Sequence, residues 1–193
     1  MGMNCAVILA AGQGTRMKSS KPKVLAEVLF KPMIDWVTDA ACDAGIDDIC
    51  LVTGFKHEMI DEHFNGKYRT VVQSELLGTG HAVMQAKDFI KEHVPGNVLV
   101  LNGDAPLIPA QTIKAALDFH IAGNNAVTVI SAKIADPFGY GRIIRSKDGK
   151  LKKNRRGKGS ERNRKNRERG QFGRVLVLKL GASRISPGNN RKA

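Results

Sequence analysis

Residues 5–17 read CAVILAAGQGTRM, and this stretch decides the fold. Residues 5–10 are all apolar or small, which predicts a short strand buried on both faces. The polar stretch 12–23 contains Gly, Ser and Pro and therefore predicts a loop. A buried strand that opens into such a loop is typical of parallel sheets, which bind ligands at the carboxyl ends of their strands.

The rest of the first 132 residues alternates between strand and helix patterns. The patterns predict further strands at 48–53, 70–73, 97–101 and 126–132, and helices at 33–44, 57–64, 80–91 and 109–122. This alternation indicates an α/β fold with a Rossmann-like, open and mainly parallel sheet that helices cover on both faces. We expect the polar loops after the first, third and fourth strands to meet in one crevice.

The net charge of +13 lies in the last part of the chain. Residues 1–150 hold 16 Lys+Arg and 16 Asp+Glu, whereas residues 151–193 hold 15 and 2. The segment 152–170 has no apolar residue, so it cannot bury surface to offset the entropy of ordering. We therefore expect one domain over 1–150 and a basic, disordered tail over 151–193. The alternative is a nucleic-acid-binding protein that uses the 152–170 tail.

Neither a membrane segment nor an export signal is expected. No apolar run reaches the roughly 18 residues that a membrane span needs, and no basic residue precedes the apolar start. The three cysteines Cys5, Cys42 and Cys50 lack metal-ligand spacing. They are expected to be reduced, small core residues of a cytoplasmic protein.

The first candidate binding segment is the loop from Gly12 to Lys23. Successive amide N–H groups of a glycine loop can cradle an anion. Arg16 offers a planar fork to phosphate oxygens, and Lys23 offers a compact charge. The loop matches neither the G-x-G-x-x-G nor the Walker pattern, so an ordinary strand-to-helix turn is the alternative.

The second candidate segment joins Gln73 to the Gly78-Thr79-Gly80 turn. The turn precedes a predicted helix, whose amino end favours negative charge. Gln73 can both donate to and accept from the edge of a uracil. A tight turn with Thr79 as the N-cap is the alternative, and His81 is expected to pack or to cap the helix.

Two further segments complete the set. Asp104 ends a predicted strand, where a carboxylate can hold Mg²⁺ beside a triphosphate; a turn Asp bonded to its own backbone is the alternative. In the segment 136–144, Gly139 and Gly141 flank Tyr140, which would let backbone approach a ligand. A bulged hairpin rim is compatible with the same residues.

Together these segments closely resemble the bacterial N-acetylglucosamine-1-phosphate uridylyltransferase family. The matching motifs are LAAGQGTRM (9–17), PKVL (22–25), LGTGHAV (77–83), NGDAPL (102–107) and DPFGYGRIIR (136–145). The first motif marks the wider sugar nucleotidyltransferase superfamily. LGTGHA and GYGR narrow the resemblance to the N-acetylhexosamine branch of that superfamily. The resemblance covers residues 3 to about 153 and implies the fold of nucleotide-diphospho-sugar transferases.

The resemblance also implies an activity and the residues that carry it. The family transfers a uridylyl group from UTP to N-acetylglucosamine 1-phosphate and uses Mg²⁺. The resemblance is also compatible with a homo-oligomer in full-length members of the family. By the resemblance, the uridine would contact Leu9, Ala10, Ala11 and Gly12, and the uracil would also contact Gln73, Gly78 and Thr79. Arg16 and Lys23 would bind the triphosphate and act in catalysis, and Asp104 would hold Mg²⁺. The sugar would contact Asn102, Gly103 and Gly141. The family usually has an aromatic residue where Asn102 stands.

The resemblance stops after Lys153, and a change of reading frame explains this best. A shift by one nucleotide lets the codons of 154–160 encode Ile-Val-Glu-Glu-Lys-Asp, which fits the family pattern I-V-E-x-K-D. The same shift over 171–175 yields Asn-Ser-Gly-Val, where the family has N-[TS]-G. The family's sugar-binding Glu and Asn, its second Mg²⁺ anchor and its acetyltransferase domain would then be missing. We therefore expect a domain that is incomplete at its C-terminal side, a weakly active chain, and residues 152–193 that do not complete the sheet, with 172–180 as their one strand-like stretch.

Overall fold

A six-stranded sheet with the expected buried strand near its centre organises the structure, which is a computed structural model. The structure describes residues 3–14, 17, 19–133, 141–146, 151–156 and 171–180. Its elements in chain order are β1 (Asn4–Leu9), η2 (Lys23–Leu25), β2 (Glu27–Val28), β3 (Lys31–Pro32), α1 (Met33–Asp43), β4 (Ile49–Thr53), α2 (His57–Phe64), β5 (Arg69–Val72), α3 (Thr79–Gln85), α4 (Lys87–Glu92), β6 (Gly96–Asn102), α5 (Ala110–Ala122), β7 (Val127–Lys133), β8 (Gly141–Arg145), β9 (Leu151–Arg156) and β10 (Gln171–Leu180).

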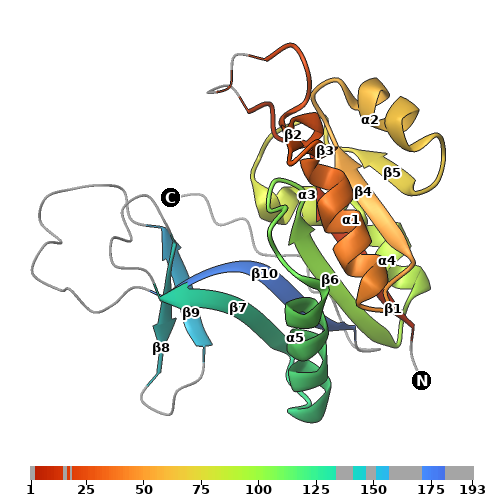
Figure 1. Ribbon diagram of the computed structural model, residues 1–193. Coiled ribbons are helices and arrows are strands. Elements are labelled where there is room, and N and C mark those ends of the chain that lie inside the picture. Colours follow the sequence, from red (N-terminus) through yellow and green to blue (C-terminus); the bar gives the residue numbers. More distant parts are fainter. Residues whose placement is uncertain are drawn as a thin grey trace, which may run out of the picture.

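The sheet has the strand order β5-β4-β1-β6-β10-β7 (Figure 1). The four strands β5, β4, β1 and β6 run parallel to one another. β10 lies between β6 and β7 and is antiparallel to both. The predicted α/β fold with an open, mainly parallel sheet is therefore confirmed.

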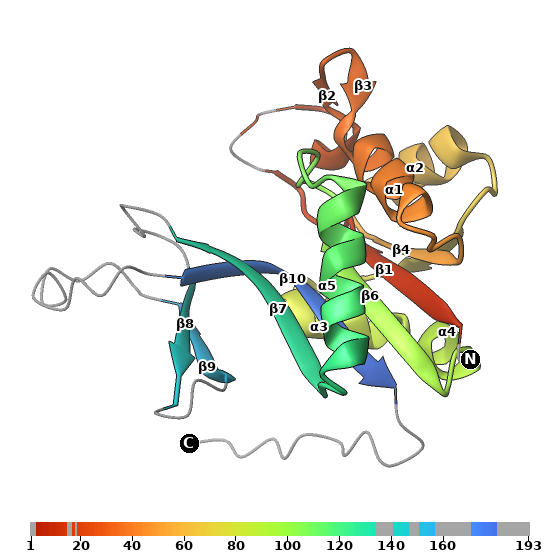
Figure 2. The same cartoon turned by 60° about the horizontal axis from the view of Figure 1, so that its bottom comes forward.

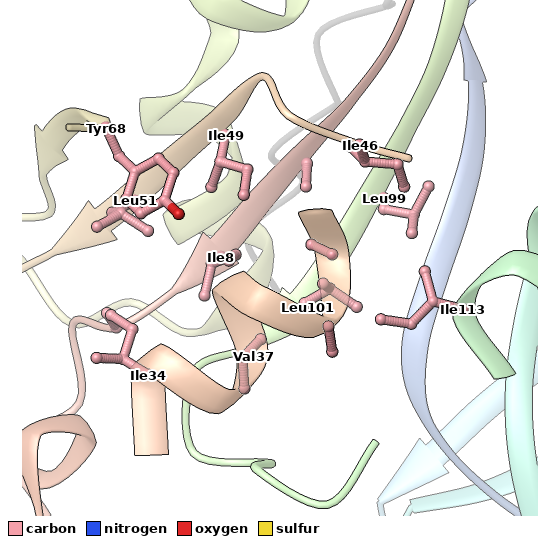
Figure 3. Close-up of a cluster of buried hydrophobic side chains, with 14 of the residues drawn as sticks. Ile8, Ile34, Val37, Ile46, Ile49, Leu51, Tyr68, Leu99, Leu101 and Ile113 are labelled. Carbon is pink, nitrogen blue, oxygen red and sulfur yellow. The ribbon is translucent and has the colours of Figure 1, made fainter. Parts of the chain in front are cut away.

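Successive residues of the central strands face opposite sides of the sheet, as the strand period of two requires. Ile8 and Leu51 pack with α1 and α5 on one face, and Leu99 and Leu101 of β6 join them (Figure 3). Each such fully buried aliphatic side chain contributes about 1.5–3 kcal/mol by leaving water. Helices therefore hold the strand ends in fixed positions on this side.

The other face carries the intervening residues and the helices α3 and α4. Val7 and Phe89 belong to this second cluster, together with Cys5 and Cys50. Both thiols are fully buried, and burial raises their pKa values, to about 12 for Cys5 and about 11 for Cys50. These two cysteines are core residues, as predicted, while Cys42 is half-buried.

The predicted strands and helices are present, with local differences. The helix predicted at 80–91 is divided at Ala86 into α3 and α4. The β2–β3 hairpin was not predicted, because strands of two residues carry no periodicity. Its turn residues Leu29 and Phe30 have positive φ angles of 53° and 64° and are largely exposed.

The expectation that residues 152–193 add nothing to the sheet is wrong for 171–180. These residues form β10, whose backbone pairs with β6 on one side and β7 on the other. The stretch RVLVLK (174–179) is rich in β-formers, and without it β6 and β7 would face each other with unpaired backbone groups. Residues 151–156 also form a strand, β9, paired with β8. Residues 157–170 and 181–193, including most of the tail predicted to be disordered, lie outside the described residues.

The β8–β9 hairpin forms a separate two-stranded sheet. Figures 1 and 2 both place this hairpin beyond the β7–β10 side, away from β4 and β5. Within the described part of the chain, none of the helices has the length and apolar character required to cross a membrane.

Candidate functional site

A cleft of about 310 Å³ opens at the carboxyl ends of the parallel strands. Leu9, the last residue of β1, is in register with Val52 of β4 and Asn102 of β6, so these strands end at one level. The backbone N–H of Gly103 donates to the carbonyl of Leu9 at 2.9 Å. The residues that line the cleft are Leu9, Ala11, Gly12, Lys23, Val24, Gln73, Leu76, Gly78, Thr79, Ala82, Asn102 and Asp104.

One side of the cleft carries an ion pair between a lysine and an aspartate. Lys23 begins η2, and its Nζ lies 2.6 Å from Oδ2 of Asp104. About a third of each side chain is exposed, 36% and 32%, so water screens the pair and it adds at most about 1 kcal/mol to stability. Both groups therefore remain able to exchange partners.

The loop after β1 makes room for the Lys23 side chain. Gly14 has a φ of +61°, and a Cβ at this position would lie 2.6 Å from the Cβ of Lys23. A glycine is required here on both counts, because other residues resist positive φ and no space exists for a side chain. The Gly14–Lys23 contact thus sets the position of the lysine at the cleft.

Buried hydrogen bonds hold the other side of the cleft. Gln73 follows β5 and has only 4% of its surface exposed. Its Nε2 donates to the carbonyl of Gly78 at 3.2 Å and lies 2.9 Å from Nδ1 of His81. Gly78 itself has a φ of +102° at the start of α3. The hydrogen bond to Gly78 therefore ties the end of the 74–78 turn to the side chain of Gln73.

The structure brings most of the predicted site residues together. Leu9, Ala11, Gly12, Lys23, Gln73, Gly78, Thr79, Asn102 and Asp104 all line the cleft. Ala10 and Gly103 are buried next to it without lining it. Gly141 begins β8 and is paired with Arg156, and it is not among the lining residues. Arg16 lies outside the described residues.

Sequence reasoning missed several residues of the site. Val24, Leu76 and Ala82 add apolar surface to the cleft. His81, which was expected to pack or to cap, has its ring Nδ1 2.9 Å from Nε2 of Gln73. No local pattern marks this contact, because it crosses the turn at 74–78.

Asp104 fits a hard divalent cation, since its carboxylate is partly exposed and faces the cleft. The described residues contain no cluster of three or more His, Cys, Asp and Glu side chains with metal-binding geometry. A cation at Asp104 would therefore take most of its oxygen ligands from water and from a bound phosphate, as Mg²⁺ commonly does.

The fold and the cleft together define a class, the α/β proteins that bind a ligand at the carboxyl ends of parallel strands. The chain belongs to the nucleotidyl transferase family, whose model matches residues 5–153. This match ends at the residue where the motif resemblance also ends. The chain is therefore a nucleotidyltransferase by family.

Curated proteins that are similar in sequence include several bifunctional GlmU proteins. The bifunctional protein GlmU of Thermoanaerobacter pseudethanolicus is 48% identical over 145 residues, which are 75% of this chain and 31% of that protein. The bifunctional protein GlmU of Acetivibrio thermocellus is 46% identical over 153 residues, which are 78% of this chain and 33% of that protein. The chain thus spans about one third of the length of the curated relatives it matches.

Solved structures share the fold. A Bacillus anthracis protein described as a glucose-1-phosphate thymidylyltransferase has a TM-score of 0.75 at 19% identity, over 92% of this chain and 72% of that one. A UDP-glucose pyrophosphorylase solved with UDP-glucose has a TM-score of 0.72 at 17% identity, over 93% of this chain and 76% of that one. At 92% and 93% of this chain, these likenesses extend beyond residue 153.

Proposed function

We propose that this chain is a uridylyltransferase domain that joins UTP to N-acetylglucosamine 1-phosphate, giving UDP-N-acetylglucosamine and pyrophosphate. The single observation that carries the proposal is the convergence of Gln73 with Lys23 and Asp104 on one cleft. A base-pairing amide and a cation beside a carboxylate are the groups that a nucleoside triphosphate with Mg²⁺ requires. The motif resemblance supplies the identity of the two substrates.

The two sides of the cleft support a proposed position for the nucleotide. The uracil lies against Gln73, Gly78 and Thr79, and the uridine continues along the backbone from Leu9 to Gly12. The triphosphate then reaches Lys23, whose charge lies near the mouth of the glycine loop. Arg16 is proposed to share this role on the basis of the motif alone.

The reaction needs no covalent intermediate on the protein. A phosphate oxygen of the sugar phosphate attacks the α-phosphorus of UTP and forms a new P–O bond. The bond from the α-phosphorus to its bridging oxygen breaks, and pyrophosphate leaves with the electron pair. Lys23 is proposed to hold the phosphates in line and to neutralise the charge that develops on them.

We propose Asp104 as the residue that holds Mg²⁺. When bound, Mg²⁺ would supply further charge neutralisation on the phosphate oxygens. The role of the protein is to position the carboxylate at the end of β6, where the Gly103–Leu9 hydrogen bond fixes the backbone.

The sugar side of the site is proposed to be the weak part of this chain. Asn102 lines the cleft, whereas Gly141 lies on the β8–β9 hairpin, which is not part of the cleft lining. By the motif resemblance, the Glu and Asn that the family uses for the sugar would lie after Lys153, where the resemblance ends. We therefore expect weak turnover together with nucleotide binding that is largely retained.

The decisive experiment measures pyrophosphate release from UTP and N-acetylglucosamine 1-phosphate. This chain is compared with one in which the reading frame is restored after Lys153. The restored chain should turn over substrate at least about tenfold faster, because it regains the sugar contacts. Equal rates would show that the segment after Lys153 is a working part of the enzyme and would refute the change of reading frame. No UTP binding by either chain would refute the proposed function.

A further inference from the structure

The side chain of Gln73 is held in one orientation. Its backbone N–H donates to the carbonyl of Thr53 at 2.7 Å, so the side chain starts from a fixed point at the end of β5. Its Nε2 donates to the carbonyl of Gly78 at 3.2 Å. A carbonyl oxygen only accepts hydrogen bonds, and therefore this contact identifies the nitrogen end of the amide.

The second hydrogen of the same nitrogen is directed at His81. Gln73 Nε2 lies 2.9 Å from Nδ1 of His81, which must accept and is therefore unprotonated. In a neutral imidazole the proton then sits on Nε2. His81 belongs to α3, so the helix holds this acceptor against the buried amide.

A second glutamine competes for the same ring. Gln85 Nε2 lies 3.1 Å from Nε2 of His81, and a neutral imidazole can accept at only one nitrogen. Gln73 needs the hydrogen bond to the ring more than Gln85 does, because Gln73 is buried and water cannot replace a bond that it loses. Gln85 Nε2 also donates to the backbone carbonyl of His81 at 3.2 Å. Because Gln85 is only half-buried, water can take over that carbonyl when Gln85 turns its amide and accepts from His81 Nε2 with its oxygen.

Both hydrogens of Gln73 Nε2 are thus used within the protein, and its oxygen Oε1 is left for the cleft. Among the described residues, none donates a hydrogen bond to Oε1, and Gln73 lines the cleft. Turning the amide over would place Oε1 against the carbonyl oxygen of Gly78, which cannot donate a hydrogen bond. With this geometry Gln73 would meet a base through its acceptor oxygen, whereas the residue type alone allows it both to donate and to accept.

We propose that His81 is a positioning residue that locks Gln73 with its carbonyl oxygen toward the cleft, and that this lock selects pyrimidines that carry a proton on N3 over cytosine. The inference rests on the proposed function, because it assumes that a nucleotide base lies at Gln73. The N3–H of uracil would donate to Oε1. The bare N3 of cytosine would face the same oxygen with a lone pair, which a site built for an N–H donor rejects.

The test compares two substitutions of nearly equal shape. In His81→Asn, the side-chain oxygen keeps an acceptor at about the place of Nδ1, whereas His81→Leu removes it. The Kd values of UTP and CTP are measured by titration calorimetry in the presence of Mg²⁺. We expect UTP to bind at least roughly tenfold more tightly than CTP to the unchanged chain. His81→Asn should keep the CTP/UTP ratio of Kd values within about threefold, and His81→Leu should lower it by about 3- to 10-fold, the equivalent of one hydrogen bond.

The ratio separates positioning from general damage, because a loosened fold weakens both nucleotides alike. An unchanged ratio in His81→Leu would overturn the proposal. The ¹⁵N chemical shifts of the His81 ring give a second test in the free protein: a proton on Nδ1 would also overturn it, and an unprotonated Nδ1 supports it. If the unchanged chain binds neither nucleotide, the proposed function fails, and base selection by His81 fails with it.

Discussion

Lys23 Nζ lies 2.6 Å from Asp104 Oδ2, although the two residues are 81 positions apart in the chain. The pair joins the segment that follows the glycine loop to the end of β6. In the free cleft each charge neutralises the other. A triphosphate with its cation would offer each group a new partner, so binding would exchange this ion pair for a phosphate contact and a metal contact.

Lys23→Met should weaken UTP binding by about 10- to 100-fold, because a contact between a charged donor and phosphate is lost. Equilibrium dialysis with radiolabelled UTP and Mg²⁺ measures the effect. Lys21→Met is the matched control, since Lys21 is exposed and does not line the cleft. Equal losses in the two variants would mean that Lys23 contributes only general positive charge.

Asp104→Asn should remove the dependence of UTP binding on Mg²⁺ and leave the fold intact. The substitution keeps the shape of the side chain and deletes the charge that a hard cation requires. Calorimetric titrations of UTP with and without Mg²⁺ should differ for the unchanged chain and coincide for the variant. A variant that still responds fully to Mg²⁺ would exclude Asp104 as the metal ligand.

Two glycines of one loop should respond differently to alanine. At Gly14 the positive φ and the 2.6 Å contact with Lys23 Cβ predict a loss of about 1–2 kcal/mol in the free energy of unfolding. At Gly12 a Cβ would meet no atom of the described residues within 4 Å, so stability should hold, yet the methyl group would enter the cleft and weaken UTP binding. Urea unfolding and UTP titration of both variants check this. Equal stability losses would contradict the loop geometry.

The sequence predicted the parallel half of the sheet well because its strands are continuous apolar runs bounded by polar loops. β1 and β6 are such runs, and their ends carry the residues that line the cleft. β10 could not be placed from the resemblance because it lies beyond residue 153, where the resemblance ends, although residues 172–180 have the pattern of a strand. The lock on Gln73 was missed for another reason. Which amide hydrogens are already used depends on contacts across a turn, and no spacing in the sequence records them.

Val177→Pro should unfold or strongly destabilise the chain if β10 completes the sheet. Val177 is paired with Leu99 of β6 and Thr128 of β7, and proline removes a backbone donor from a strand with neighbours on both sides. We expect a loss of about 3 kcal/mol or more in urea unfolding. Val177→Ala keeps the backbone N–H and serves as the control. A proline variant as stable as the alanine variant would remove β10 from the sheet.

Stability should fall as the pH rises above about 9, in part because of the buried thiols. In the unfolded chain Cys5 and Cys50 lose their protons near the ordinary value of 9.0, whereas burial raises their folded pKa values to about 12 and about 11. Between these limits the unfolded state binds fewer protons, so deprotonation favours unfolding. The free energy of unfolding measured from pH 8 to 10.5 should decline less steeply in Cys5→Ala/Cys50→Ala. Identical slopes would show that other groups control this range.

The place of β10 has a consequence for synthesis on the ribosome. β6 ends at Asn102 and β7 ends at Lys133, but the strand that belongs between them is completed only at Leu180. A growing chain therefore exposes two unsatisfied strand borders during the translation of nearly fifty further residues after β7. Such borders are templates for wrong pairing between nascent chains. The rate at which ribosomes cross this interval, and the chaperones present there, should therefore affect the yield of folded protein more than the same factors acting on the first hundred residues.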